Sequence, residues 1–265
     1  MRCKFLCVMS AVTVAFSLVL FGLLPTNQPL LAAALELSAH RQAAVITTTV
    51  ILTPVKDSTL YESNSGDTSN GVGTFFFVGK TNNGEIRRGL VAFDVAGQLP
   101  TSATVVSATL QLQMTKTSGE PANVTLHRAL ADWGEGSSDA SANEGQGATA
   151  TPGDATWLHT FFDTALWQTP GGDFAPINTA SIQVDGTGAY RWPSSPAMIA
   201  DVQQWLNDPA SDFGWVLVGN ESENKTAKRF TARESDIAAN RPQLTVVYTV
   251  TGAVSSTIYL PLVQK

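Results

Sequence analysis

Cysteine is almost absent from this chain of 265 residues, which has only two, Cys3 and Cys7. Both lie in an N-terminal stretch with the pattern of a cleaved signal, so the mature chain would hold no thiol. Disulfide bridges, cysteine nucleophiles and cysteine-ligated zinc sites are thereby excluded. The stability of the folded protein must come from its hydrophobic core.

Histidine and charged side chains are also scarce. The sequence has three histidines, and 14% of its residues are charged. With His40 close to the N-terminal stretch, too few histidines are left for a His-based triad or a three-histidine metal site. The motifs G-x-S-x-G and H-E-x-x-H and the P-loop are absent as well. Gly, Thr, Ser and Val are plentiful instead, a composition typical of an extracellular all-β module.

Residues 1–34 have the three parts of a secretory signal. A basic start with Arg2 and Lys4 is followed by an apolar stretch over residues 11–24 and by the small residues 32–34. The alternative is an uncleaved membrane anchor, but the apolar stretch ends before the roughly 20 residues that a membrane span requires. The sequence therefore predicts a secreted or cell-surface protein, with no membrane span in the mature chain.

Without this signal the chain has an excess of acidic side chains. Removal of Arg2 and Lys4 from the sixteen Lys and Arg leaves fourteen against 22 Asp and Glu, a net charge of −8. Such a chain offers no general basic face, and we expect no nucleic-acid partner. Five basic residues nonetheless fall within residues 225–241, which predicts one local basic patch.

Strands dominate the predicted secondary structure. The sequence at 82–84 predicts a hairpin turn, and 185–186 a second hairpin that joins 177–184 to 188–192. One helix is predicted over 196–207, where apolar residues follow helical spacing. Alternating or β-branched apolar runs predict further strands over 45–53, 57–62, 74–79, 87–94, 105–115, 123–130, 213–218, 228–233 and 244–249.

These elements favour an all-β fold, a jelly-roll-like β-sandwich with one short helix. It would span residues 45–250, after the signal peptide (1–34) and a lead-in linker (35–44), and before a C-terminal tail (251–265). The tail contains the hydrophobic sequence IYLPLV, which is too short to cross a bilayer. The centre of the sandwich is expected in 212–249, where three predicted strands follow one another.

Several short motifs follow one another along the chain. They are 57–60 (DSTL), 88–94 (RGLVAFD), 107–110 (SATL), 127–128 (HR) before 132–135 (DWGE), 201–205 (DVQQW) with Gly214, and 230–234 (FTARE) with 241–244 (RPQL). In this order they resemble the DNRLRE domain, a secreted β-sandwich module grouped with carbohydrate-binding module family 96. The chain departs from the motif that names the family, because NNGEIRR stands at 82–88 and only Arg88 corresponds.

The resemblance implies a jelly-roll-like sandwich that binds an extracellular polysaccharide, with alginate-like acidic glycans as the best-known ligand type. It implies no conserved catalytic set, so we expect a non-catalytic carbohydrate-binding module. Two other classes stay open. One is a structural or adhesive component of a cell envelope or matrix, with surface or matrix proteins as partners, and the other is a polysaccharide lyase or glycoside hydrolase.

An acidic glycan would need cationic donors and flat apolar faces. The local basic run supplies Lys225, Lys228, Arg229 and Arg233, and the last two share one face if a single strand contains them. For Arg233, an ion pair with Glu234 is an equal alternative. The aromatic candidates lie at loop edges beside polar residues, where an exposed sugar platform and a packing role both fit. They are Trp133, Trp157, Trp167 and Trp192.

The long segment over residues 131–154 has no hydrophobic periodicity and is rich in glycine and acidic residues. Loops of this length inside compact domains are usually functional or disordered. Oxygen donors suit calcium, and Asp132, Glu135 and Asp139 are the candidate ligands, although the spacing of an EF-hand is absent. A glycosidase pair of carboxylates has no local signature, and solvated acids are the simpler interpretation of this segment.

Overall fold

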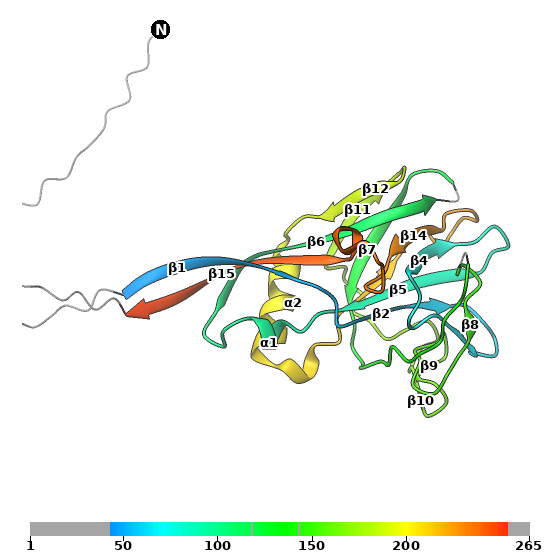
Figure 1. Ribbon diagram of the computed structural model, residues 1–265, viewed down its shortest axis with the longest axis horizontal. Helices are drawn as coiled ribbons and strands as arrows, with labels where there is room; N and C mark the ends of the chain where they lie inside the picture. The colour runs from blue at the N-terminus through cyan, green and yellow to red at the C-terminus, as the bar shows by residue number, and fades with distance from the viewer. Residues whose placement is uncertain (1–42, 118, 143, 254–265) are drawn as a thin grey trace, which may run out of the picture. The chain divides into compact units, whose positions relative to one another are not determined.

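The computed structural model describes residues 43–117, 119–142 and 144–253, which form an antiparallel, curled β-sandwich (Figure 1). The predicted all-β class is confirmed. The helices are α1 (Val95–Gln98) and α2 (Pro196–Asn207), and single 3-10 turns lie at Pro209–Ser211 and Ala238–Asn240. The strands are β1 (Ala43–Leu52), β2 (Lys56–Tyr61), β3 (Thr68–Ser69), β4 (Phe75–Lys80), β5 (Ile86–Ala92), β6 (Thr104–Thr117), β7 (Ala122–Arg128), β8 (Ala148–Thr149), β9 (His159–Phe161), β10 (Ala165–Leu166), β11 (Ala180–Val184), β12 (Gly188–Trp192), β13 (Trp215–Val218), β14 (Lys228–Thr231) and β15 (Gln243–Ala253).

The sandwich has two layers that share strand β4. The β6 layer contains β1, β15, β6 and β12, and β14 and β4 continue it past the end of the β15 pairing. The β5 layer contains β2, β5, β13, β7 and β11. In β4, Phe75–Val78 pair with β14, whereas Gly79 and Lys80 pair with β5. The sheet therefore passes from one layer to the other at Gly79, whose positive φ of 101° suits glycine.

Large aromatic side chains fill the space between the layers. Trp205 of α2 contacts Trp215 of β13 with ring centres 4.6 Å apart, and Phe230 packs on Phe76 at 5.7 Å. Helix α2 begins at Pro196, and its N-cap, Ser195, accepts a hydrogen bond from the backbone of Met198. The predicted helix is confirmed, residue for residue. It covers one end of the core with its apolar face.

A second, smaller core lies on the outer face of the β5 layer. Leu60, Leu90 and Val216 point outward from this layer and are buried by the segment that connects β7 to β11. Both faces of β5 and β13 are thus covered. This explains why their sequences read as dense apolar runs and not as alternating ones.

One predicted hairpin is confirmed and the other is wrong. Strands β4 and β5 pair across the turn at 82–84 as expected. Strand β11, however, pairs with β7, and β12 pairs with β6, so residues 185–187 cross from one layer to the other. The physical reason is the core, because Val184 and Trp192 are both fully buried in it from opposite layers.

The first and last strands extend beyond the residues predicted for the sandwich. Strand β1 begins at Ala43, inside the predicted linker, and β15 continues to Ala253, inside the predicted tail. The predicted signal peptide and most of the tail lie outside the described residues. Within the part that the structure describes, no helix has the length and apolar character needed to cross a bilayer.

Candidate functional site

A cleft of about 520 Å³ opens where strands β4, β5, β6 and β14 meet the segment 141–147. Four basic residues and one acidic residue line it, together with the aromatic side chain of Phe77. We call it the basic cleft. Its charged residues are Arg87, Lys116, Lys228, Arg229 and Glu144.

The floor of the basic cleft is a row of side chains across three strands. Arg229 of β14 lies directly opposite Phe77 of β4 on one side and Lys116 of β6 on the other. Residues directly opposite in an antiparallel sheet point to the same face. Antiparallel register therefore places a guanidinium, an ammonium and an aromatic ring side by side.

Arg229 is held in a fixed position by its neighbours. Its guanidinium carbon lies 3.8 Å from the ring centre of Phe75, and its Nε donates to the Thr115 hydroxyl over 3.0 Å. Stacking on Phe75 fixes the plane of the guanidinium. Its two Nη groups, which form the fork, form no hydrogen bond with the described residues. A planar anion such as a carboxylate fits this fork with paired hydrogen bonds.

Arg87 and Glu144 attach the segment 141–147 to the sheet. Arg87 is buried over the Tyr61 ring and donates to the carbonyl of Gly145. The Glu144 carboxylate accepts hydrogen bonds from the Asn70 amide and the Phe75 backbone N–H, both at 2.9 Å. Tyr61 donates to the Glu144 carbonyl over 2.8 Å. These contacts hold Glu144 at a positive φ of 58°, a strained conformation for a residue other than glycine.

Lys228 contributes charge to the cleft but no free donor. Its ammonium donates to the Thr117 hydroxyl (2.6 Å) and to the carbonyls of Glu120 (2.7 Å) and Gly119 (3.2 Å). An ammonium has three donors, so all of them are used inside the protein. The predicted role of Lys228 as a direct ligand contact conflicts with this geometry, because the side chain is buried and fully hydrogen-bonded.

The cations of the basic cleft have no carboxylate partners in ion pairs among the described residues. The ion pairs of the described residues involve other cations, namely Lys56, Arg88, Arg128 and Arg233. Burial lowers the pKa of Arg87, Lys228 and Arg229, and the nearby carboxylates, such as Glu144 for Arg229, only partly oppose this effect. An anionic ligand in the cleft would supply the missing countercharge.

A separate cluster of acidic residues surrounds Arg233. Oxygens of Asp57, Glu135 and Glu234 lie within 4.8 Å of one another. Arg233 Nε donates to Glu135 over 2.7 Å and lies 2.9 Å from Glu234, and its backbone N–H donates to Asp57 over 2.8 Å. Of the two roles open to Arg233, the structure shows the ion pair. Because β14 ends at Thr231, Arg233 is not in one strand with Arg229.

Burial controls the protonation of this acidic cluster. It raises the pKa of Asp57 well above its usual range, and the negative charge of Glu234 adds to the effect. Burial also raises the pKa of Glu234 to about 7, against the opposing effect of Arg233. Hydrogen bonding to Glu135 raises the pKa of Arg233, so this guanidinium stays charged. Arg233 is thus the one residue that contacts all three carboxyl groups of this cluster, through its guanidinium and its backbone N–H.

The three predicted calcium ligands do not come together. Only Glu135 enters the acidic cluster, where it already binds Arg233. Asp132 forms an ion pair with Lys56 at 2.7 Å, and Asp139 is exposed elsewhere on the segment. The predicted set is therefore wrong as a group. The reason is that the segment folds against β2 and the turn after β14, so its acids meet basic side chains of the domain.

All four candidate tryptophans are buried, so of the two roles open to them the structure shows packing and not an exposed platform. Trp133, Trp157 and Trp167 are buried beneath the segment that joins β7 to β11, and Trp192 lies in the main core. Three of them also donate their indole N–H to backbone carbonyls. Polar neighbours in sequence had suggested loop edges, but the segment folds back over the sheet and covers the rings.

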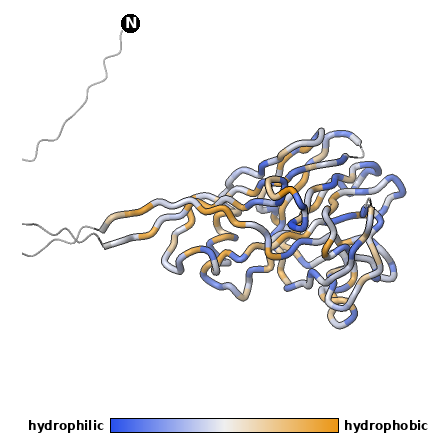
Figure 2. The backbone as a smooth tube through the Cα atoms, viewed as in Figure 1, coloured by the Kyte–Doolittle hydropathy of each residue, from blue (hydrophilic) through white to orange (hydrophobic). Residues whose placement is uncertain are grey.

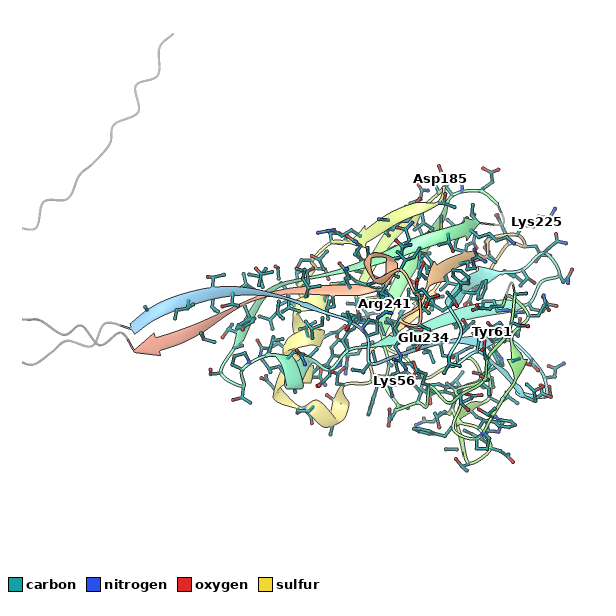
Figure 3. The ribbon with its side chains drawn as sticks, in the orientation of Figure 1. Lys56, Tyr61, Asp185, Lys225, Glu234 and Arg241 are labelled. Atoms are coloured by element: carbon teal, nitrogen blue, oxygen red, sulfur yellow. The ribbon has the colours of Figure 1, made fainter. Side chains whose placement is uncertain are left out.

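Lys225 lies outside the basic cleft. It is exposed in the turn before β14, apart from Glu234 of the acidic cluster (Figure 3). Arg229 and Lys228 are the predicted residues that do line the cleft. Arg87 and Lys116 were missed, because cross-strand register and not sequence distance brings them there. The end of the long alternating strand, where Lys116 follows 21 residues without charge, was the available signal.

Two comparisons with known proteins bear on this site. No protein-family model matches the sequence, and no curated protein matches it either. The chemistry of the basic cleft is therefore the basis for assigning a function.

Proposed function

We propose that the basic cleft binds an acidic saccharide of an extracellular polysaccharide and does not cleave it. The observation that carries this proposal is the row formed by Lys116, Arg229 and Phe77, whose cations form no ion pair among the described residues. A volume of about 520 Å³ lies within the range of small-ligand sites.

The row matches the chemistry of a uronic acid. The fork of Arg229 would take the carboxylate with paired hydrogen bonds, and the exposed ammonium of Lys116 would approach a neighbouring anionic group. Phe77 offers an apolar edge to the C–H face of a sugar ring. Neutral sugars would leave the cations unpaired, so the site favours acidic residues.

Binding without cleavage is supported by the acidic residues of the cleft. Hydrolysis of a glycosidic bond commonly requires two carboxyl groups on opposite sides of that bond. Glu144 is the one acidic residue among those that line the cleft, and its carboxylate is engaged with Asn70 and Phe75. The acidic cluster around Arg233 is a separate set of residues, and none of its members lines the cleft.

Two features of the sequence agree with this proposal. The N-terminal signal pattern supports export from the cell, to where acidic polysaccharides occur. The resemblance to the DNRLRE domain points to the same ligand class. We therefore propose a secreted, non-catalytic carbohydrate-binding domain.

Affinity electrophoresis in gels that contain a polyuronate, with a neutral glucan as comparison, tests the proposal. We expect retardation by the polyuronate alone. Arg229→Ala should weaken binding about tenfold to a hundredfold, because a charge-assisted hydrogen bond contributes about 1.5–3 kcal/mol. Lys225→Ala removes an exposed cation outside the cleft and should leave binding unchanged.

Two results would contradict this function. Equal retardation of wild type and Arg229→Ala would place binding elsewhere on the molecule. Release of new reducing ends or unsaturated sugars from the polyuronate by the purified protein would show an enzyme and not a binding domain.

A further inference from the structure

Strand β1 forms one edge of the β6 layer and extends past it. It pairs with β15 along its whole length, from Ala43 opposite Ala253 to Leu52 opposite Leu244. The pairing of β15 with β6 stops at Thr249, so the far part of the ribbon has two strands only (Figure 1). A two-stranded ribbon is marginally stable by itself, and a further strand would stabilise it.

Exposed apolar side chains gather at this ribbon. Figure 2 shows hydrophobic stretches along this ribbon. Nine large hydrophobic residues are exposed in the described part of the chain, and five lie on β1, just after it or on β6, which β15 separates from β1. Val45 is 67% exposed and Ile51 is 60% exposed. The other three are Ile46, Val55 and Val106.

The same surface has no charge. No Asp, Glu, Lys or Arg occurs in β1, in β15, or over residues 104–115 of β6. Natural edge strands are usually protected from pairing by lysines, prolines or bulges. Between Ala43 and Leu52 the outer edge of β1 has none of these. Among the described residues, no strand pairs with this edge.

The sequence of β1 is symmetric in chemical character about Thr48. Two apolar β-branched residues, three threonines and two apolar β-branched residues follow one another over 45–51 (VITTTVI). When this strand pairs antiparallel with an identical strand about Thr48, each residue meets one of its own kind. Such β-branched and threonine pairs are favourable across strands.

We propose that β1 pairs antiparallel with β1 of a second copy, about a twofold axis at Thr48, so that two β6 layers join into one sheet. Val45 of each copy then lies opposite Ile51 of the other, and Thr47 opposite Thr49. A twofold axis perpendicular to the sheet keeps the exposed face of both ribbons on the same side, which this register satisfies.

Two observations favour a second copy over another partner. The chain has a net negative charge, so identical molecules repel one another except through an uncharged surface such as this one. The second is the symmetry of β1 about Thr48, because an identical strand matches it residue for residue.

Sedimentation equilibrium of the purified full chain tests this proposal. We expect a mass of two chains for the wild type. Thr48→Lys and Thr48→Glu each place two like charges directly opposite at the axis, so each variant should sediment as a monomer. An equimolar mixture of the two variants should recover the dimer, because opposite charges then meet at the axis.

Ile177→Lys is the matched control, since it adds the same charge at an exposed apolar residue far from β1 in sequence. It should remain dimeric. Circular dichroism of all variants should be unchanged, because Thr48 is exposed. A monomeric wild type, a dimeric Thr48→Lys variant, or a mixture that stays monomeric would each overturn the proposal. None of these outcomes depends on polysaccharide binding.

Discussion

At the scale of single residues, the arginines have two kinds of surroundings. Arg88 and Arg233 each form an ion pair with a carboxylate, whereas Arg229 stacks on Phe75 and forms none among the described residues. The sequence around these arginines does not distinguish the two groups, because their partners come from distant strands. The candidate residues could be predicted from composition, but their roles could not.

The raised pKa of Glu234 leads to a prediction about the pH dependence of stability. Burial raises this pKa from 4.5 to about 7. The folded state therefore binds a proton more tightly than the unfolded state does. Its stabilising contribution is complete below pH 4.5 and is lost as the pH rises through 7. Glu234→Gln stays neutral at every pH, so it should raise the free energy of unfolding at pH 8, relative to wild type, by about 1 kcal/mol after allowance for solvent screening.

Urea unfolding at pH 5 and pH 8 measures this difference. Glu223→Gln changes an exposed carboxylate and is the control. Asp212 also has its pKa raised to about 7 by burial, so the wild type and both variants should keep some pH dependence. If Glu234→Gln lost the same free energy at both values of pH, its ion pair with Arg233 would matter more than its burial.

At the scale of elements, strands were easier to predict than their partners. The alternation in β6 and the spacing in α2 are local patterns, and both elements lie where the sequence indicates. The partners of β11 and β12 depend on which layer buries Val184 and Trp192, and local sequence does not contain that information. The cleft was missed for the same reason, since register brings Lys116 beside Arg229.

The passage of β4 from one layer to the other at Gly79 leads to a prediction about stability. A Cβ at Gly79 would lie 2.7 Å from the carbonyl oxygen of Thr226, and φ there is 101°. Gly79→Ala should therefore lower the free energy of unfolding by about 2–4 kcal/mol through strain and overlap. Gly186→Ala has open space around its Cβ and should change stability by less than about 0.5 kcal/mol. Equal thermal unfolding temperatures for the two variants would contradict this account of the bend.

At the scale of the whole molecule, folding of the long segment decides what a ligand can reach. Residues between β7 and β11 cover the outer face of the β5 layer and bury Trp133, Trp157 and Trp167. No local pattern in that segment predicts this packing, because hydrogen-bonded turns and three strands of only two or three residues, β8, β9 and β10, form it. The aromatic surface expected for sugar binding is thereby removed, whereas the basic cleft stays accessible.

The net charge of the whole molecule leads to a prediction about how salt changes the binding rates. The protein carries 22 acidic against 16 basic side chains, so a polyuronate chain is repelled as it approaches and attracted only inside the cleft. Salt screens the long-range repulsion over a Debye length of about 10 Å at 0.1 M. The association rate constant for a polyuronate should therefore rise between about 0.01 and 0.1 M salt, while the dissociation rate constant rises because the contacts to Arg229 weaken.

Surface plasmon resonance over this range of salt concentration measures both rate constants. Arg229→Ala should keep the salt dependence of association and lose that of dissociation. An association rate that falls steeply with salt would instead show that the cleft dominates the field of the whole molecule.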